Sequence, residues 1–490
     1  MTPTPTPTPA LDDDELYVGY NEWAARELGV TLCTDFVYDY DDDDNGDDCG
    51  DADGVSRERG VFIAEDIAPQ TLILSIPRSS LLTVEWLERQ VSQAHAFYSN
   101  VSVFQRLNEL RRRSSDEDTS DALQDDTHID DGSATLALQE DDALAIALAF
   151  ETFVQRNRSK WYPHLRLLPT SYNNLLYFDD DELSRLRGTG LFLVAQQMRT
   201  KVQHDHSRLR ELLALETAFA TDEGVVLPMD EWFSLSHYQW ALSTIWSRFV
   251  SVELSDAPTV KAMVPVFDML NHDPLAQVAH GFNASTQAFE LVAHQHWSAG
   301  AQLFINYGPL SNHKLLALYG FVVPDNPHDA VEVWLPPAAA TTHIDKRLLA
   351  LRSLGIDSEN SAFEVMFGQI NELLVIATRL LEYDVDQDAD FDATLTKIVE
   401  GKVLDSALEV HVLSRVIYTL QQILEASPGA NIDTDGSSGN GQVHQGRLAM
   451  ARLVCDTDRR ILEDQINLLK WRLLDYLPPA PATSENGNDE

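Results

Sequence analysis

Cysteine and basic residues are scarce in this 490-residue chain. Its three cysteines, Cys33, Cys49 and Cys455, lie far apart and never in a C-x-x-C pair. This spacing indicates neither a disulfide framework nor a structural zinc site, and it favours a reducing compartment. Only 35 Lys and Arg residues oppose 78 Asp and Glu residues, which gives a formal net charge of −43. That charge disfavours nucleic acid and anionic membrane as partners and favours a Lys-rich or basic protein, although an acidic surface also serves solubility alone.

Long hydrophobic runs are missing as well. No stretch is apolar over the length that a bilayer span requires, and the Thr-Pro repeat at the start has neither the basic nor the apolar region of a secretory signal. We therefore expect an intracellular protein without a membrane anchor, located in the cytoplasm, the nucleus or both.

The motifs of several enzyme classes are also absent. The sequence has no P-loop, no dinucleotide-binding G-x-G-x-x-G and no nucleophile elbow. Two histidine pairs, His204 with His206 and His294 with His296, have no cysteine or carboxylate cluster beside them. We therefore predict no metal site, and we expect His204 and His206 to be solvated on a polar helix.

Hydrophobic periodicity indicates two kinds of secondary structure. A helical spacing occurs over residues 141–156, 191–220 and 235–252, and throughout the chain from Ile344 onward. Short strands bounded by Pro, Asn or Gly are predicted at residues 260–267, 289–292 and 302–307. Charged segments poor in apolar residues predict loops at 39–53 and about 111–140, and disordered tails at 1–10 and 478–490.

Three segments rich in apolar and aromatic residues follow one another in a particular order. They are Pro265–His272 (PVFDMLNH), Phe304–Gly308 (FINYG) and Leu318–Phe321 (LYGF). Together with upstream elements, Arg59–Ala64 and Trp161–Leu165 among them, this series resembles the SET-domain protein methyltransferases of the RuBisCO large-subunit methyltransferase-like branch. The resemblance covers most of the chain, and the order of the segments is more specific than any one of them.

The resemblance implies an α+β fold. Small β-sheets of a SET domain are interrupted by a helical insertion and followed by an all-α C-terminal domain that binds the protein substrate. An apolar strand is expected to lead into Asn271-His272. The expected divisions are the two parts of the SET domain at 15–82 and 239–330, the helical insert at 83–238 and the C-terminal domain at 340–477.

The same resemblance implies S-adenosyl-L-methionine as the cofactor. In-line methyl transfer requires aligned groups and a dry site, and aromatic rings and oxygens stabilise the cationic centre. The resemblance makes Tyr307 the catalytic tyrosine, whose hydroxyl orients the methyl group and the incoming amine. Residues expected to contact the cofactor are Arg57, Glu58, Arg59, Gly60, Asn271, His272 and Tyr307. Gly60 lets the backbone approach the methionine portion, whereas the side-chain roles of Glu58 and Arg59 stay open.

The substrate channel is also assigned from the resemblance. Residues expected to line it are Arg248, Phe267, Asp268, Tyr319 and Phe321. An aromatic channel suits the apolar stem of a lysine and favours the neutral amine that must attack. We therefore expect a monomeric protein-lysine N-methyltransferase acting on a basic protein such as a ribosomal or chromatin protein. Two alternatives remain: histidine as the acceptor, which a large aromatic residue at position 267 accommodates in this branch, and a SET-fold peptide-binding scaffold without turnover.

Overall fold

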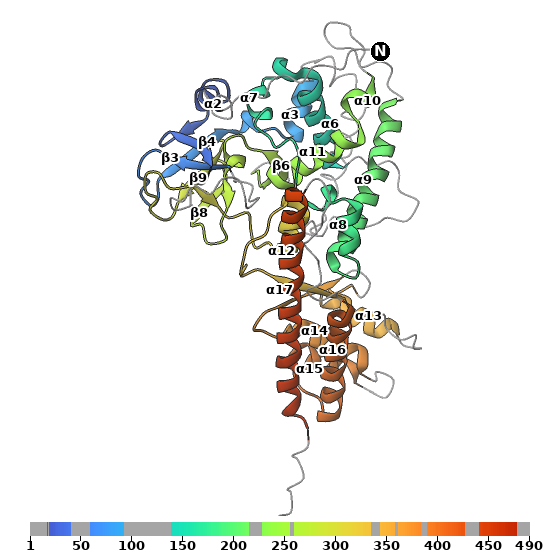
Figure 1. Cartoon of the computed structure of the whole chain (residues 1–490). Helices are drawn as coiled ribbons and strands as arrows, with labels where there is room; N and C mark the ends of the chain where they lie inside the picture. The colour runs from blue at the N-terminus through green and yellow to red at the C-terminus, as the bar shows by residue number, and fades with distance from the viewer. Residues whose placement is uncertain are drawn as a thin grey trace, which may run out of the picture. The chain divides into compact units, whose positions relative to one another are not determined.

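The computed structural model describes ten segments of the chain (Figure 1). They are residues 17, 19–40, 59–92, 139–214, 228–254, 259–334, 344–357, 361–383, 390–426 and 441–477. The chain divides into two compact units. Unit 1 comprises Met1–Phe178, Val194–Pro309 and Ala317–Gly320, and unit 2 comprises Asp179–Leu193, Leu310–Leu316 and Phe321–Glu490.

Unit 1 contains an antiparallel four-stranded sheet. Its strand order is β1-β4-β9-β8, with bounds Thr31–Leu32, Leu72–Pro77, Ala288–Ala293 and Val278–Asn283. Alternate residues of β9, among them Phe289 and Leu291, are buried in the core. The strand expected at 289–292 is therefore confirmed, and the period of two explains which face of β9 is apolar.

Among its described residues, unit 1 also contains three two-stranded ribbons. The pairs β2 (Phe36–Tyr40) with β3 (Arg59–Ile63) and β5 (Phe249–Val252) with β6 (Val260–Met263) are antiparallel. The third pair, β7 (Asn271–His272) with β10 (Phe304–Ile305), is parallel. These short sheets agree with the expected α+β class.

Several predicted boundaries were wrong in this region. The helix expected over 235–252 ends at Arg248, because the following Phe-Val-Ser-Val segment has the β-branched and aromatic character of a strand and forms β5. The strand expected over 260–267 ends at Met263, since Pro265 has no N–H for a strand ladder. No strand leads into Asn271: residues Phe267–Met269 form the 3₁₀ turn η5.

Helices pack around these sheets. Those of unit 1 are α2 (Tyr20–Leu28), α3 (Val84–Ser92), α6 (Glu140–Ala149), α7 (Tyr162–Leu165), α10 (Met229–Trp232), α11 (Leu235–Arg248) and most of α9 (Gly190–Ala214). Helix α6 runs through the core, where all seven residues of 143–149 are fully buried. It continues as the π-helical turn η2 (Phe150–Gln155) and the 3₁₀ turn η3 (Arg156–Arg158), and further 3₁₀ turns are η1 (Arg78–Ser80) and η4 (Leu175–Tyr177). The expected helix at 141–156 is thus confirmed, and the helix expected at 191–220 is confirmed as far as Ala214, beyond which its residues lie outside the described part of the chain.

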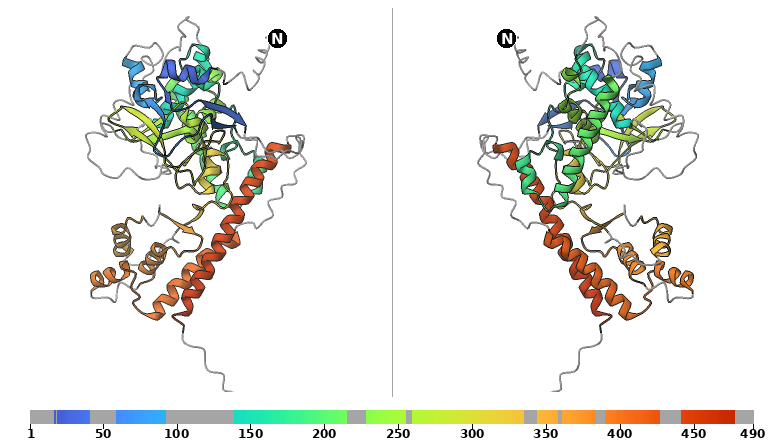
Figure 2. Two further views of the ribbon diagram at one scale, coloured as in Figure 1. Left: turned by 90° about the vertical axis from the view of Figure 1, so that its left-hand side faces the viewer. Right: turned by 90° about the vertical axis from the view of Figure 1, so that its right-hand side faces the viewer.

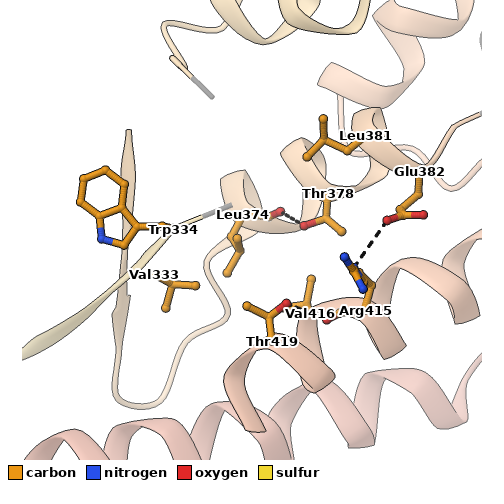
Figure 3. Close-up of a pocket in the computed structure, with 9 residues that line it drawn as sticks. All are labelled: Val333, Trp334, Leu374, Thr378, Leu381, Glu382, Arg415, Val416 and Thr419. Carbon is orange, nitrogen blue, oxygen red and sulfur yellow. Dashed lines mark hydrogen bonds and ion pairs between the residues drawn. The ribbon is translucent and has the colours of Figure 1, made fainter. Parts of the chain in front are cut away.

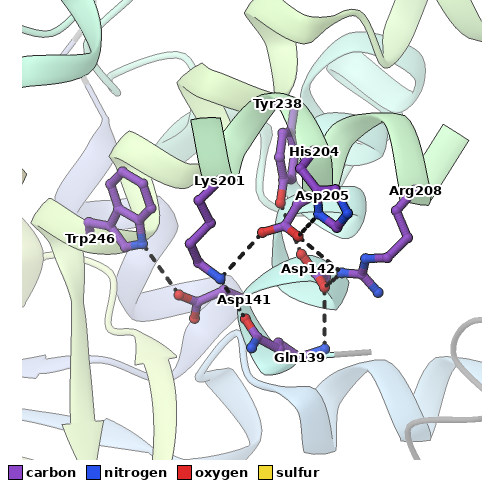
Figure 4. A network of polar contacts seen from close by, with 9 residues as sticks. All are labelled: Gln139, Asp141, Asp142, Lys201, His204, Asp205, Arg208, Tyr238 and Trp246. Atoms are coloured by element: carbon purple, nitrogen blue, oxygen red, sulfur yellow. Dashed lines mark hydrogen bonds and ion pairs between the residues drawn. The ribbon is translucent and has the colours of Figure 1, made fainter. Parts of the chain in front are cut away.

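A polar network holds the start of α6 (Figure 4). The buried Asp142 carboxylate accepts hydrogen bonds from Arg208 at 2.6 Å, Tyr238 at 2.9 Å and the Gln139 N–H at 3.3 Å. Burial raises the pKa of Asp142, and the neighbouring Arg208 cation opposes this effect. Asp141 pairs with Lys261 of β6 at 2.7 Å. Acidic groups at this helix end therefore join α6 to α9, α11 and β6.

Unit 2 is mainly helical (Figure 2). Its helices are α8 (Asp180–Arg185), α12 (Asn312–Lys314), α13 (Ile344–Ser353), α14 (Glu372–Glu382), α15 (Phe391–Val399), α16 (Ser406–Ala426) and α17 (Gly441–Leu474), and the turn η6 (Leu315–Tyr319) begins here. The expectation of unbroken helix from Ile344 was wrong at β12 (Ala362–Met366), which pairs with β11 (Ala330–Trp334). Phe363 and Val365 point inward and Glu364 outward, so the segment has the period of a strand.

The core of unit 2 joins β11 and β12 to the long helices. Within it, Arg379 of α14 makes two hydrogen bonds with Glu409 of α16, at 2.7 Å and 3.0 Å, and both side chains are almost fully buried. Figure 3 shows a shallow recess beside β11, α14 and α16. Its lining residues are Val333, Trp334, Leu374, Thr378, Leu381, Glu382, Arg415, Val416 and Thr419. None of the predicted site residues lies there.

The predicted loops fall mostly outside the described residues. Asp39 and Tyr40 belong to β2, and Gln139 and Glu140 begin the α6 region, which corrects the ends of the loops expected at 39–53 and 111–140. The remainder of both loops and the tails at 1–10 and 478–490 lie outside the described part of the chain. Within that part, no helix combines the length and apolar character of a membrane span.

Candidate active site

The parallel pairing of β7 with β10 brings two predicted motifs together. Asn271 lies opposite Phe304, and His272 lies opposite Ile305. Tyr307 follows two residues later, and its backbone N–H donates a hydrogen bond to His272 Nδ1 at 3.1 Å. The rings of His272 and Tyr307 are stacked, with centroids 4.9 Å apart. Residues separated by 35 positions therefore form one local site.

Tyr307 is held at its hydroxyl as well as at its backbone. The hydroxyl donates to the Leu270 carbonyl oxygen at 2.8 Å. On the ring, Tyr319 stacks at 5.1 Å with an interplanar angle of 25°. Burial raises the pKa of Tyr319, which keeps its phenol protonated. The rings of His272, Tyr307 and Tyr319 thus form a stacked column. The hydroxyl of Tyr307, the central ring, lies next to the Leu270 carbonyl oxygen.

Gly320 fixes the backbone beside Tyr319. It has φ +83°, and a Cβ placed there would lie 2.7 Å from the Asn174 nitrogen and 2.8 Å from the Asn173 carbonyl carbon. The buried Asn174 amide donates to the Leu318 carbonyl at 3.3 Å and to Ser243 of α11 at 3.0 Å. Only glycine suits this combination of conformation and close approach, which locates Tyr319 against the rest of unit 1.

Asn271 connects this site to β3. Its amide Nδ2 donates to the Arg59 carbonyl oxygen at 2.8 Å. The Arg59 guanidinium donates to the Tyr17 hydroxyl at 3.2 Å and lies 5.8 Å from the centre of that ring. Arg57 and Glu58 lie outside the described residues. The structure therefore brings Arg59 and Asn271 together through the Arg59 backbone, while the Arg59 side chain contacts Tyr17.

Gly60 has a close neighbour of its own within the protein. A Cβ at this position would overlap the Gln302 amide nitrogen and lie 2.6 Å from Gln302 Cδ. The Gln302 side chain is buried. Packing against Gln302 is thus sufficient by itself to require glycine at position 60, whereas the sequence analysis attributed this glycine to the cofactor.

Arg248 supplies positive charge to the site. Its Nη1 donates to the Asp268 carbonyl at 2.8 Å and lies 3.9 Å from Met269 Sδ. Burial lowers the pKa of Arg248, but the neighbouring Tyr172, Asp268 and Tyr307 outweigh this effect, and the net pKa is raised. The guanidinium therefore remains a fixed cation near the Tyr307 hydroxyl.

The two residues before Met269 have different surroundings. The Asp268 side chain is fully buried, and its Oδ2 lies 3.1 Å from His164 Nε2. Its Oδ1 has no hydrogen-bond partner among the described residues. The Phe267 ring is 0% exposed and packs on Phe289 at 4.8 Å and His280 at 5.0 Å. Asp268 therefore has one buried carboxylate oxygen without a hydrogen-bond partner among the described residues, and Phe267 is a core residue without a solvent-facing surface.

The last predicted channel residue, Phe321, belongs to unit 2 and is half-buried. Three functional neighbours, Tyr20, His164 and Asn174, were missed by sequence reasoning. His164 lies within the Trp161–Leu165 segment that carried the resemblance, yet the segment gave no indication of a role for its imidazole. Tyr20 and His164 are 144 positions apart and touch only in the folded chain.

Three of the four paired histidines, His204, His294 and His296, are exposed. His204 is exposed and lies 3.4 Å from Asp205, as expected. His206 is buried, with Nε2 3.0 Å from the Phe233 carbonyl, so the expectation that it is solvated was wrong. It faces the core because α9 packs on the 228–238 region along one side. Among the described residues there is no group of three His, Cys, Asp or Glu that could hold a metal ion.

Comparison with known proteins identifies the family. The profile described as "SET domain" matches residues 58–308, just over half of the chain. SET domain-containing protein 4 of Homo sapiens is 32% identical over 213 residues, which cover 41% of this chain and 46% of that protein. Actin-histidine N-methyltransferase of Gallus gallus is 26% identical over 280 residues, covering 56% and 40% respectively. The chain thus spans less than half the length of either relative.

Solved structures share the fold over nearly the whole chain. The structure titled "Crystal structure of the SET domain of LSMT bound to Lysine and AdoHcy" matches with a TM-score of 0.67 at 16% identity, covering 95% of this chain and 93% of that one. "Structure of Rubisco LSMT bound to AdoMet" matches with a TM-score of 0.63 at 18% identity, covering 94% and 93%. At this level of identity the likeness concerns the fold. With residues 58–308 matching the family profile and the fold shared throughout, the chain belongs to the SET-domain family.

Proposed function

We propose that this protein is an S-adenosyl-L-methionine-dependent protein methyltransferase that modifies a side-chain nitrogen, with lysine as the acceptor. The observation that carries the proposal is the column formed by His272, Tyr307 and Tyr319, with the Tyr307 hydroxyl on the Leu270 carbonyl. Membership of the SET-domain family supports it. The solved structures named above, which share the fold, contain AdoMet or AdoHcy by their titles.

The residues present suit a cationic cofactor. Aromatic faces and carbonyl oxygens stabilise a positive charge, and here they are supplied by Tyr307, His272 and the Leu270 carbonyl. Asn271 and the Arg59-Gly60 backbone would complete the cofactor-binding set, together with Arg57 and Glu58. When bound, S-adenosyl-L-methionine supplies a methyl group activated by its sulfonium. The task of the protein is to hold this group in line with the acceptor and to exclude water.

The surroundings of Tyr307 favour an uncharged amine. Removal from water among these half-buried residues disfavours the charged form of an entering amine, so an ammonium group loses its proton more readily there. The half-buried Tyr319 ring, at one end of the column, offers an apolar face to a lysine stem, and the Tyr307 hydroxyl and the Leu270 carbonyl oxygen lie at the polar end.

Histidine is the second candidate acceptor. It is supported by the relatives named actin-histidine N-methyltransferase, which match more of this chain than SET domain-containing protein 4 does. The bulky Phe267, which suggested histidine in the sequence, is engaged with Phe289 and His280 in the core. This packing weakens one argument for histidine, and we therefore place lysine first.

The acidic composition supports a basic protein substrate, such as a ribosomal or chromatin protein, met in the cytoplasm, the nucleus or both. A net charge of −43 attracts a Lys-rich surface, and salt screens that attraction. We propose that the enzyme acts as a monomer on this partner. If partner capture does not weaken between low and high salt, the electrostatic basis of this proposal fails.

The experiment is transfer of a radiolabelled methyl group to lysate proteins from cells that lack this protein, so that the acceptor is unmethylated. Wild type is compared with Tyr307→Phe and with Tyr418→Phe, a matched change at an exposed tyrosine of α16. We expect labelling by wild type and Tyr418→Phe only. Tandem mass spectrometry then identifies the methylated residue. Methyl-lysine would support lysine as the acceptor, and methyl-histidine would support the second candidate. Cofactor binding without any labelled protein would instead support the peptide-binding scaffold.

A further inference from the structure

A buried chain of hydrogen bonds connects helix α2 to the turn that precedes Asn271. Tyr20 Oη lies 2.6 Å from His164 Nδ1, and His164 Nε2 lies 3.1 Å from Asp268 Oδ2. The Val266 backbone N–H also donates to Tyr20 Oη, at 3.2 Å. Tyr20 is 2% exposed and His164 is 0% exposed. The chain therefore contacts the turn twice, at Val266 directly and at Asp268 through the imidazole.

The direction of each hydrogen bond follows from its neighbours. Because the Val266 N–H is a donor, Tyr20 Oη accepts from it and directs its own hydrogen to His164 Nδ1. His164 then carries its hydrogen on Nε2, from which it donates to the Asp268 carboxylate. Burial raises the pKa of Tyr20, so its phenol stays protonated and keeps its donor role. Every polar atom of this imidazole is thereby engaged.

The turn held in this way has an unusual backbone. Val266 has φ +73° and ψ −49°, a region that a β-branched residue rarely adopts. Such a conformation persists only where the surroundings hold it, and it is frequent near functional sites. The Val266 side chain is fully buried, and its N–H is the one bound by Tyr20.

The far side of the same turn faces the proposed active site. The Asp268 carbonyl accepts from Arg248, and the Leu270 carbonyl accepts from the Tyr307 hydroxyl. Asn271 and His272 follow immediately in β7. A displacement of this turn would therefore shift the acceptors of both Arg248 and Tyr307.

We propose that Tyr20 and His164 are positioning residues, which clamp the strained 264–270 turn so that the Leu270 carbonyl stays in place for the Tyr307 hydroxyl and the Asp268 carbonyl stays in place for Arg248. This inference rests on the proposed methyltransferase function for its catalytic consequence. Whether Tyr20 and His164 hold the 264–270 turn in place can be tested without measuring methyl transfer. Neither residue needs to touch the cofactor or the acceptor.

The test uses the full chain and four single substitutions. Tyr20→Phe removes the acceptor of the Val266 N–H, and His164→Leu removes the link to Asp268. His164→Gln keeps an oxygen acceptor and an N–H donor in similar places, and it should rescue. Tyr38→Phe is the matched control, because Tyr38 is a tyrosine of the same aromatic cluster whose hydroxyl donates its hydrogen bond to Asn21.

Hydrogen–deuterium exchange of the peptide covering 259–272 is measured first. We expect exchange at least about tenfold faster in Tyr20→Phe and His164→Leu, with Tyr38→Phe and His164→Gln within about threefold of wild type. In methyl transfer, kcat should fall at least about tenfold in the first two variants, while the Kd for S-adenosyl-L-methionine stays within about threefold.

Unchanged exchange in Tyr20→Phe and His164→Leu would overturn the clamp. The proposal would also be overturned if His164→Gln and His164→Leu lost the same amount of kcat at equal thermal stability, because the hydrogen-bonding groups of glutamine would then not restore the function of His164. If wild type transfers no methyl group to any protein, the proposed function fails, and the exchange result still decides whether the turn is clamped.

Discussion

Replacing Gly60 by alanine should destabilise unit 1 through a single steric conflict. The new Cβ would overlap the Gln302 amide and lie 2.6 Å from Gln302 Cδ and 3.0 Å from Cγ. Gln302 is buried and paired with Phe62 across a β-bridge, so it has little room to turn away. Overpacking of this kind costs about 1–3 kcal/mol. In a unit of this size, we expect a fall in Tm of roughly 2–12 °C.

A double-mutant cycle tests the cause. Gln302→Ala removes the obstructing amide, so Gly60→Ala/Gln302→Ala should be no less stable than Gln302→Ala alone. The coupling energy should then be about 1–2 kcal/mol in favour of the double variant. Gly281→Ala is the matched control, because this glycine also lies in a strand of unit 1 and its Cβ would meet nothing within 4 Å.

Urea unfolding monitored by tryptophan fluorescence and by circular dichroism provides the free energies, since coincident curves justify a two-state treatment. The reasoning is refuted if Gly60→Ala is as stable as Gly281→Ala. It is equally refuted if the losses from Gly60→Ala and Gln302→Ala add without coupling, because Gln302 is then not the source of the conflict.

Three further predictions concern other contacts. Gly320→Ala should lower the free energy of unfolding by at least about 2 kcal/mol, through backbone strain at φ +83° and the clash with Asn174. Gly300 has φ +78° and no atom near its Cβ position, so Gly300→Ala should lose only the stability that backbone strain removes. Urea unfolding of the two variants gives both free energies. Arg379→Met should destabilise unit 2 by about 3–5 kcal/mol because the buried Glu409 loses both hydrogen bonds from Arg379 and keeps only the ion pair with Arg472 at 3.9 Å. Arg379→Met/Glu409→Leu should recover most of that loss, and an additive double variant would contradict this. Burial lowers the pKa of His313, but Asp458 at 2.7 Å outweighs it and the pKa is raised. The stabilisation by protonated His313 is thus complete below the ordinary histidine pKa of about 6.5, and it is lost as the pH rises through the raised pKa of the folded state. The Tm difference between wild type and His313→Gln should therefore shrink between about pH 6 and about pH 9. A difference that grows over this range would reverse the assignment.

The residues at the centre of the candidate site could be grouped from the sequence, because they lie in short motifs. Asn271 with His272 and Tyr307 with Gly308 are each adjacent in the chain, and the parallel pair β7–β10 brings them into contact. Tyr319 could be grouped with them for the same reason. The resemblance also anticipated the α+β class and the helical region after residue 344, apart from β12.

What could not be predicted depends on tertiary contacts. Tyr20 is connected through His164 to Asp268, and it also binds the Val266 N–H, which lies 246 positions away in the sequence. No rule based on sequence spacing predicts contacts over such a separation. The local sequence pattern also gave a wrong helix end where a helix passes directly into a strand. Helix α11 ends at Arg248 and strand β5 begins at Phe249, so the apolar residues of both were assigned to one helix. Phe267 was assigned to the channel from its position in a motif, and only the fold reveals its core packing.

The most direct test of the central claim is the single-turnover rate of methyl transfer in Tyr307→Phe, measured with the Kd for S-adenosyl-L-methionine on the same preparation. The lost hydrogen bond to Leu270 accounts for about 1 kcal/mol in the ground state, a factor of less than about ten. If the hydroxyl orients the reacting groups, the rate should fall by at least about 100-fold while the Kd changes by less than about threefold. A Tyr307→Phe variant that transfers methyl groups as fast as wild type would contradict the account.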